Sequence, residues 1–92
     1  MRLHRYWIKF NTTLKDPYPA SSVFLGVGVT ALTEDDALYL IRLKIFEGQE
    51  LPPIKEIIED IDVSTLDPKH VLYNIRGNPA ARGIWFPQGF DF

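Results

Sequence analysis

The chain contains no cysteine, which removes a group of structures and activities from consideration. Disulfide bonds, thiolate zinc sites, redox CxxC motifs and thiol nucleophiles all require cysteine. Because a chain without cysteine suits a reducing compartment, we expect a cytoplasmic protein. A small domain that lacks disulfides depends for its stability on its apolar core, on a metal or on a partner.

Long apolar runs and a basic excess are also missing. No run approaches the roughly 18 residues of a membrane span, and MRLHRYWIKF lacks the apolar segment and the cleavage site of a signal peptide. We therefore expect no membrane span and no secretory leader. Ten basic residues against twelve acidic ones give a net charge of −2, which argues against a nucleic-acid partner.

What is present is typical of one ordinary globular domain over residues 1–92. The chain is 46% hydrophobic and 24% charged, so it carries enough apolar surface to fold. A chain of this length encloses a single core and buries only about 60–65% of the surface that its unfolded form exposes.

Two strands are expected in the first third of the chain. HRYWIKF (4–10) alternates Tyr6, Ile8 and Phe10 on one face with polar residues and Trp7 on the other, which is typical of a strand. A turn-rich loop follows, and VFLGVGVTA (23–31) then has the apolar run of a central strand.

Gly26 and Gly28 lie on one face of the second expected strand. A phosphate cradle is one interpretation, but the pattern is not GxGxxG and no lysine follows. We favour the structural interpretation, in which the missing side chains let a helix or a large aromatic such as Trp7 or Trp85 approach the backbone.

Thr33 and the acidic residues after it predict the start of the main helix. Asp36 stands three residues after Thr33, as in a capping box, and Gly48 predicts an end at about Phe46 or Glu47. The helical spacing gives a core stripe of Ala37, Leu38, Ile41 and Ile45.

A second apolar stripe on the nearly opposite side of this helix consists of Tyr39, Leu43 and Phe46. One sheet cannot cover both stripes. Either the C-terminal segment wraps over the helix or a second molecule covers it, and a symmetric homodimer is the usual way to bury such a surface. A cofactor pocket is a weaker alternative, and we expect no cofactor.

The second half of the chain is less clear. Residues 51–63 fit a helix by spacing and a strand by their β-branched content, and we favour a strand because the main helix then connects two strands. Such a strand would place Ile57, Ile61 and Val63 on one face. Asp67 and Pro68 predict a short helix over 68–74, and GIWF (83–86) predicts a last strand.

These elements predict an α+β fold. We expect a two-layer sandwich in which one main helix packs on a mostly antiparallel sheet, in the approximate order β-β-α-β-(short α)-β.

Acidic residues and a histidine suggest two kinds of chemistry. Asp60, Asp62 and Asp67 resemble a metal-binding cluster, but their spacing does not match a known calcium loop, and we expect no metal site. His70 with Asp67 or Asp62 offers a general base for a small hydrolase or isomerase, although no recognisable nucleophile setting accompanies it.

Arginine and tryptophan in the C-terminal third indicate binding instead. Arg76, Arg82 and Trp85 are residue types enriched in binding hot spots, and guanidinium groups bind carboxylates in a bidentate manner. Alternatively, Arg82 pairs with Asp60 or Asp62 within the monomer.

Three segments, HRYWIKF, GVGVTALTEDDAL and EDIDVSTLDPKHVLYNIRGNPAARGIWFP, resemble a group of small bacterial proteins without an established activity. The resemblance implies a free-standing bacterial protein, and some similar small acidic proteins act as immunity or accessory partners in toxin systems. Our leading hypothesis is a non-catalytic protein-binding module, with Tyr39, Leu43, Phe46, Arg76, Arg82 and Trp85 as its candidate binding residues.

Overall fold

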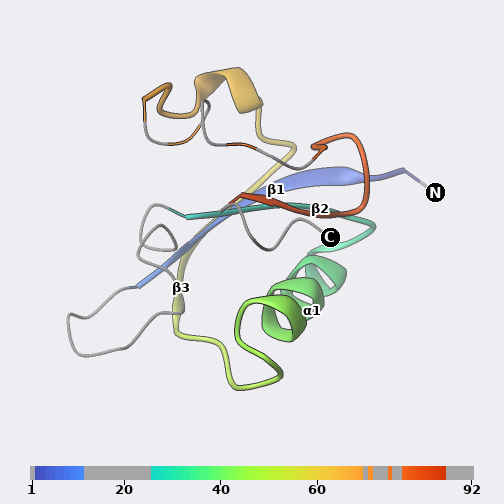
Figure 1. The fold of residues 1–92 in the computed structure, drawn as a ribbon, viewed down its shortest axis with the longest axis vertical. Helices are drawn as coiled ribbons and strands as arrows, with labels where there is room; N and C mark the ends of the chain where they lie inside the picture. Colours follow the sequence, from blue (N-terminus) through green and yellow to red (C-terminus); the bar gives the residue numbers. More distant parts are fainter. Residues whose placement is uncertain (1, 12–25, 70, 72–74, 76–77, 87–92) are drawn as a thin grey trace.

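The computed structural model describes residues 2–11, 26–69, 71, 75 and 78–86 of the chain. Within them lie four strands, one α-helix and one 3-10 helix (Figure 1). The strands are β1 (His4–Phe10), β2 (Val27–Ala31), β3 (Ile54–Glu59) and β4 (Gly83–Phe86), and the helices are α1 (Glu34–Lys44) and η2 (Val63–Thr65).

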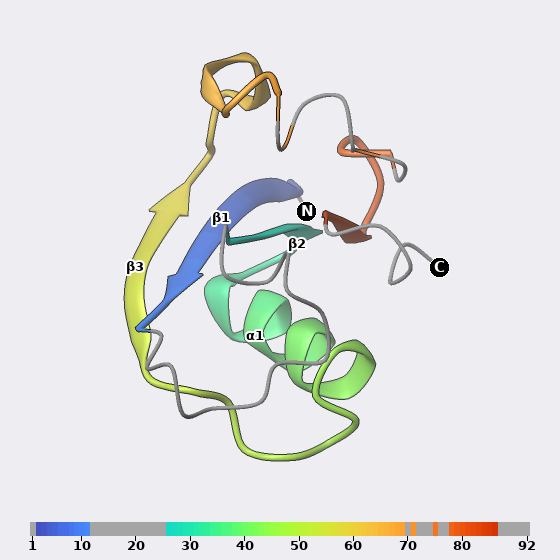
Figure 2. The ribbon, with the colours of Figure 1, turned by 60° about the vertical axis from the view of Figure 1, so that its left-hand side comes forward.

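The strands form one sheet in the order β3-β1-β2-β4, and all neighbouring strands are antiparallel. Because β2 and β3 both run antiparallel to β1, they are parallel to each other, and α1 connects them across the sheet. Figure 2 shows β3 beside β1, with α1 packed against one face of the sheet. The expected α+β class, with one main helix on an antiparallel sheet, is confirmed.

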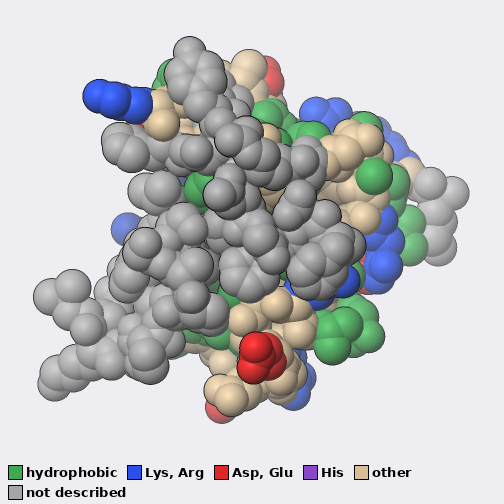
Figure 3. Space-filling model, in the orientation of Figure 1, with side chains coloured by type: hydrophobic (Ala, Val, Ile, Leu, Met, Phe, Trp, Pro, Cys, Tyr) green, Lys and Arg blue, Asp and Glu red, His purple; other side chains and the backbone are tan. Residues whose placement is uncertain are grey.

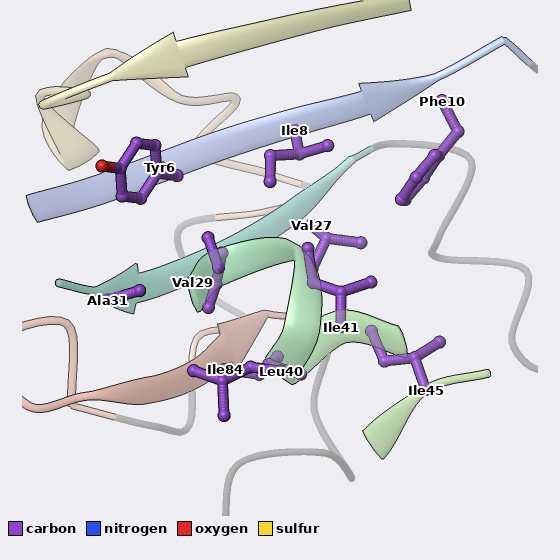
Figure 4. Close-up of a cluster of buried hydrophobic side chains, with 11 residues drawn as sticks. Tyr6, Ile8, Phe10, Val27, Val29, Ala31, Leu40, Ile41, Ile45 and Ile84 are labelled. Carbon is purple, nitrogen blue, oxygen red and sulfur yellow. The ribbon is translucent and has the colours of Figure 1, made fainter. Parts of the chain in front are cut away.

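The period-two pattern of β1 separates its side chains between two faces. Tyr6, Ile8 and Phe10 point toward α1, whereas Trp7 lies on the opposite face. The first core cluster fills the space between the sheet and α1 and consists of Tyr6, Ile8, Phe10, Val27, Val29, Ala31, Ala37, Leu40, Ile41, Ile45 and Ile84 (Figure 4).

The second core cluster covers the other face of the sheet and consists of Trp7, Leu66, Val71, Trp85 and Phe86. The chain segment after β3, which includes η2, lies on this side, opposite α1 (Figure 1). An irregular segment therefore takes the place of a second helical layer.

The two glycines next to and within β2 make room for the tryptophans of this second cluster. A side chain at Gly26 would come within 2.6 Å of the Trp7 ring, and one at Gly28 would overlap the Trp85 ring. Such distances are far below van der Waals contact, so only glycine fits there. The structural interpretation of the glycine pair is confirmed.

Helix α1 begins as its sequence predicts. The Thr33 Oγ1 atom accepts the backbone N–H of Asp36 at 3.1 Å, and three acidic residues occupy the first turn. The helix ends at Lys44, two to three residues before the expected end at Phe46 or Glu47. Glu47 has a positive φ of 53° and Gly48 one of 86°. Two consecutive residues in the left-handed region therefore follow the helix, where the sequence predicted glycine alone.

Residues 54–59 form a strand, as expected, but the face assigned to the residues after it is wrong. Asp60 has a positive φ of 54°, which ends the strand and turns the chain. As a result Ile57 packs against the first core cluster, whereas Ile61 and Val63 pack against the second.

The short helix expected over 68–74 falls mostly on residues that the structure does not describe, so it stays a prediction. At its expected start Asp67 caps a turn, since its Oδ1 accepts the N–H of Lys69 at 2.9 Å and its carbonyl accepts the N–H of Val71 at 2.9 Å. A 3-10 helix that the sequence did not predict lies earlier, at η2, where Asp62 is the N-cap. Residues 70 and 72–74 lie outside the described residues.

Candidate functional site

The side of α1 that faces away from the sheet carries two exposed apolar side chains. Tyr39 is 58% exposed and Leu43 is 49% exposed, one helical turn apart. Asp35 and Arg42 are exposed as well and lie on the same side, because residues spaced by three or four positions share a helix face. We call the surface formed by Asp35, Tyr39, Arg42 and Leu43 the outer face of α1.

A hollow of about 190 Å³ opens on this face and is lined by Tyr39, Arg42, Leu43 and Gly48. The turn after the helix holds its rim in place, because the Gly48 N–H donates to the Arg42 carbonyl at 2.8 Å and the Arg42 Nε donates to the Gly48 carbonyl at 3.2 Å. An aromatic ring, a leucine and a fixed guanidinium therefore border one shallow cavity. Such a cavity suits an apolar side chain with an acidic group beside it.

The charges along α1 are separated by sign. Glu34, Asp35 and Asp36 occupy its first turn, and Arg42 and Lys44 its last. This order complements the helix dipole, and it also gives the helix an acidic end and a basic end. In the space-filling view, hydrophobic and basic side chains lie next to each other over the region of α1 (Figure 3).

Phe46 was expected to belong to this surface, and that expectation needs correction. Its ring meets the Phe10 ring edge-on, with centroids 5.8 Å apart, and it packs against the first core cluster. The helix has already ended at Lys44, so the helical spacing that placed Phe46 beside Tyr39 no longer applies. The apolar part of the outer face is reduced to Tyr39 and Leu43.

Arg82 forms an ion pair within the protomer, but with a different partner from the expected Asp60 or Asp62. Its Nη2 lies 2.5 Å from Asp36 Oδ1 and its Nε lies 2.9 Å from Asp36 Oδ2, so the contact is bidentate. Asp36 Oδ2 also accepts the N–H of Leu32 at 3.0 Å. The hydrogen bond from Arg82 holds the pKa of the Asp36 carboxyl below its ordinary value.

Trp85 is fully buried and cannot contact a partner as an exposed anchor would. Its ring stacks on Trp7 with centroids 6.1 Å apart, and its Nε1 donates to the Thr30 hydroxyl at 3.1 Å. We therefore leave Trp85 out of the candidate surface. Arg76, the third expected anchor, lies outside the described residues.

The alternative catalytic set lies only partly within the described residues. His70 lies outside them, while Asp67 caps the turn described above. Asp62 accepts from the backbone N–H and the hydroxyl of Ser64 at 3.0 and 2.7 Å, and these bonds lower the pKa of the Asp62 carboxyl. Both carboxylates thus serve to shape turns.

A second group of polar side chains lies where β1 begins and β3 ends. His4, Glu59 and Asp60 bring a ring nitrogen and two carboxylates together. Nearby, Arg2, Leu3, Arg5, Asp60, Ile61 and Asp62 line a polar hollow of about 330 Å³. Sequence reasoning missed this group because Asp60 was considered with Asp62 and Asp67, and the strand register that brings His4 to it was not considered.

Comparisons of the chain with protein-family models, with curated proteins and with solved structures give no match. Among the described residues, no helix is long and apolar enough to cross a membrane. The aromatic residues of β1, which would have to stack on bases in a single-strand nucleic-acid complex, are buried.

Proposed function

We propose that this protein is a non-catalytic protein-association module whose outer face of α1 pairs with the same face of a second copy. The observation that carries the proposal is the exposure of Tyr39 and Leu43, one turn apart, around an apolar hollow. Single exposed apolar residues are common on protein surfaces, but two that border one cavity on the same helix face are typical of an interaction site.

The charge order along α1 supports a second copy as the occupant. In an antiparallel, two-fold pairing around Tyr39, the acidic first turn of one helix meets the basic last turn of the other. Asp35 of one copy then faces Arg42 of the other, and this contact occurs twice. The two helix dipoles are also antiparallel, which adds to the attraction.

The same arrangement fills the hollow. Antiparallel helices that meet at Tyr39 bring an apolar side chain of each copy toward the cavity of the other. Burying the exposed parts of Tyr39 and Leu43 contributes on the order of 2 kcal/mol for each side chain. Because one helix face provides less than the roughly 800 Å² per partner of a standard interface, we expect a weak, concentration-dependent dimer.

An accessory or immunity-like role in a bacterial system would use the same face to hold another protein, and it remains a prediction. We also propose a cytoplasmic location, which fits the cysteine-free composition.

Sedimentation velocity over a wide range of protein concentrations tests the proposal. We expect the wild type to shift from monomer to dimer with increasing concentration and the Leu43→Glu variant to stay monomeric, since a carboxylate then enters the apolar hollow. Glutamate is a good helix former, and circular dichroism verifies that the variant is folded.

Ile54→Glu is the matched control, because Ile54 is 39% exposed and belongs to β3, not to the outer face of α1. The control should associate like the wild type. A wild type that stays monomeric at every concentration, or a Leu43→Glu variant that still dimerises, would refute the proposal.

A further inference from the structure

Strand pairing brings His4 next to the adjacent residues Glu59 and Asp60, although more than fifty positions separate His4 from them along the sequence. Tyr6 pairs with Glu59 in the antiparallel β1–β3 register, and His4 lies on the same face of β1 as Tyr6. Figure 2 shows the two strands side by side. After Glu59 the chain turns through Asp60, and the Ile61 N–H donates to the Arg5 carbonyl at 3.1 Å, which fixes the turn against β1.

The donor atoms are already close to the separations that a metal ion requires. His4 Nδ1 lies 2.9 Å from Asp60 Oδ1 and 3.7 Å from Glu59 Oε1, and the three donor atoms lie within 4.8 Å of one another. Metal–ligand bonds of about 2.0–2.2 Å in a tetrahedral site place donors roughly 3.3–3.6 Å apart. Small side-chain rotations bridge that difference.

The supporting contacts restrict how these side chains can move. The His4 side chain is only 24% exposed. The Tyr6 hydroxyl, at the edge of the first core cluster, donates to Glu59 Oε1 at 3.4 Å and thereby orients that carboxylate. Outer hydrogen bonds of this kind hold metal ligands in place in known sites. The histidine is therefore partly buried, whereas the exposed carboxylates of Glu59 and Asp60 are oriented by their contacts with Tyr6 and His4.

We propose that His4, Glu59 and Asp60 bind a divalent transition-metal ion such as Zn²⁺, which ties the start of β1 to the end of β3. An imidazole nitrogen with two carboxylates suits Zn²⁺ and its neighbours in the first row, whereas Ca²⁺ and Mg²⁺ prefer sites made entirely of oxygen. Water completes the coordination, because the site opens to solvent at both carboxylates.

Isothermal titration calorimetry of the full chain with ZnCl₂, and separately with MgCl₂, tests this site. We expect one Zn²⁺ per chain with a dissociation constant in the micromolar range and no measurable Mg²⁺ binding. Asp60→Asn and Glu59→Gln should weaken Zn²⁺ binding by at least about tenfold, as the loss of an interaction at a metal site typically does. Both substitutions keep the side-chain size, and asparagine tolerates the positive φ of position 60.

Two controls locate the bound metal. Glu56→Gln removes a carboxylate of the same strand that pairs with Lys9 at 3.8 Å, and His70→Gln removes the other histidine of the chain. Both should bind Zn²⁺ like the wild type. Absence of Zn²⁺ binding, or binding that survives Asp60→Asn and Glu59→Gln, would overturn the site and would leave the proposed pairing of α1 untouched.

Discussion

At the scale of single residues, the position that constrains the sequence most is Gly28. The Trp85 ring lies against its Cα, and the Trp85 Nε1 donates to Thr30, two residues along the same strand. The Thr30 hydroxyl in turn donates to the Pro79 carbonyl at 2.6 Å, so one buried hydroxyl connects the tryptophan to the loop before β4. One small residue and one hydroxyl thereby determine where the largest buried side chain sits.

The Gly28→Ala substitution should destabilise the protein, because its new methyl group overlaps an enclosed ring that has no room to move. We expect a loss of about 1–3 kcal/mol in the free energy of unfolding, the usual cost of overpacking. Urea denaturation followed by tryptophan fluorescence measures it.

Gly48→Ala provides the comparison, since that glycine has a positive φ of 86° and open space around it. It should cost about 1 kcal/mol through backbone strain, with no change in the surroundings of the tryptophans. A Gly28→Ala protein as stable as the wild type would show that Trp85 does not occupy the place described.

The sequence predicted the purpose of the glycine pair but not the burial of Trp85. Glycines in an apolar strand indicate that another group packs closely against the backbone, and the two tryptophans were among the candidates for that group. The burial of Trp85 depends on Leu66 and Val71, which pack in the same core cluster and follow no strand or helix period in the sequence. Arginine next to tryptophan therefore resembled a binding hot spot, although the ring belongs to the core.

At the scale of elements, the Asp36–Arg82 ion pair joins the first turn of α1 to the residue before β4. The Asp36 carboxylate also accepts a hydrogen bond from the N–H of Leu32, just before the helix. It therefore links Leu32, the first turn of α1 and Arg82. In the sequence, the spacing of Asp36 from Thr33 indicated only a helix start. The ion pair with Arg82 could not be predicted from spacing, because 46 positions separate the two residues.

This ion pair predicts a pH dependence of stability. The pKa of Asp36 is lower in the folded protein than its ordinary value of 3.8, so its contribution to stability is present above that value and is lost as the pH falls through the folded pKa. Arg82→Gln should be less stable than the wild type near neutral pH, and the difference should narrow as the solution becomes strongly acidic.

Urea unfolding at a series of pH values from about 6 to 2 measures this difference, over the range in which carboxylates protonate. Lys9→Gln is the control, because it removes an exposed cation that does not touch Asp36. If the gap between Arg82→Gln and the wild type stays constant down to the lowest pH, the pair does not act through the Asp36 carboxylate.

The strands and the main helix were predictable from period and capping, and the element ends were less so. The helix stops at Lys44 and the third strand at Glu59 because Glu47 and Asp60 take positive φ values, which non-glycine residues seldom adopt. Asp60 also moves Ile61 to the other side of the sheet. Neither position is a glycine, the residue that usually indicates a positive φ in a sequence.

At the scale of the whole molecule, the sheet is covered on both faces, but the main helix is covered only on the face toward the sheet. Helix α1 lies on one face of the sheet and the segment after β3 on the other, whereas the outer face of α1 keeps Tyr39 and Leu43 in solvent. The sequence indicated this surplus of apolar surface on the helix. It could not show that Phe46 turns inward, which leaves a smaller patch bordered by charges of both signs.

The central claim is that two copies meet along α1 in antiparallel orientation, and a charge exchange tests it most directly. Asp35→Lys and Arg42→Glu each place like charges opposite one another in a homodimer, so each variant alone should sediment as a monomer at concentrations where the wild type dimerises. Mixed in equal amounts, the two variants restore opposite charges at both contacts, and the mixture should sediment as a dimer. A mixture that remains monomeric while the wild type dimerises, or single variants that dimerise like the wild type, would contradict the antiparallel pairing.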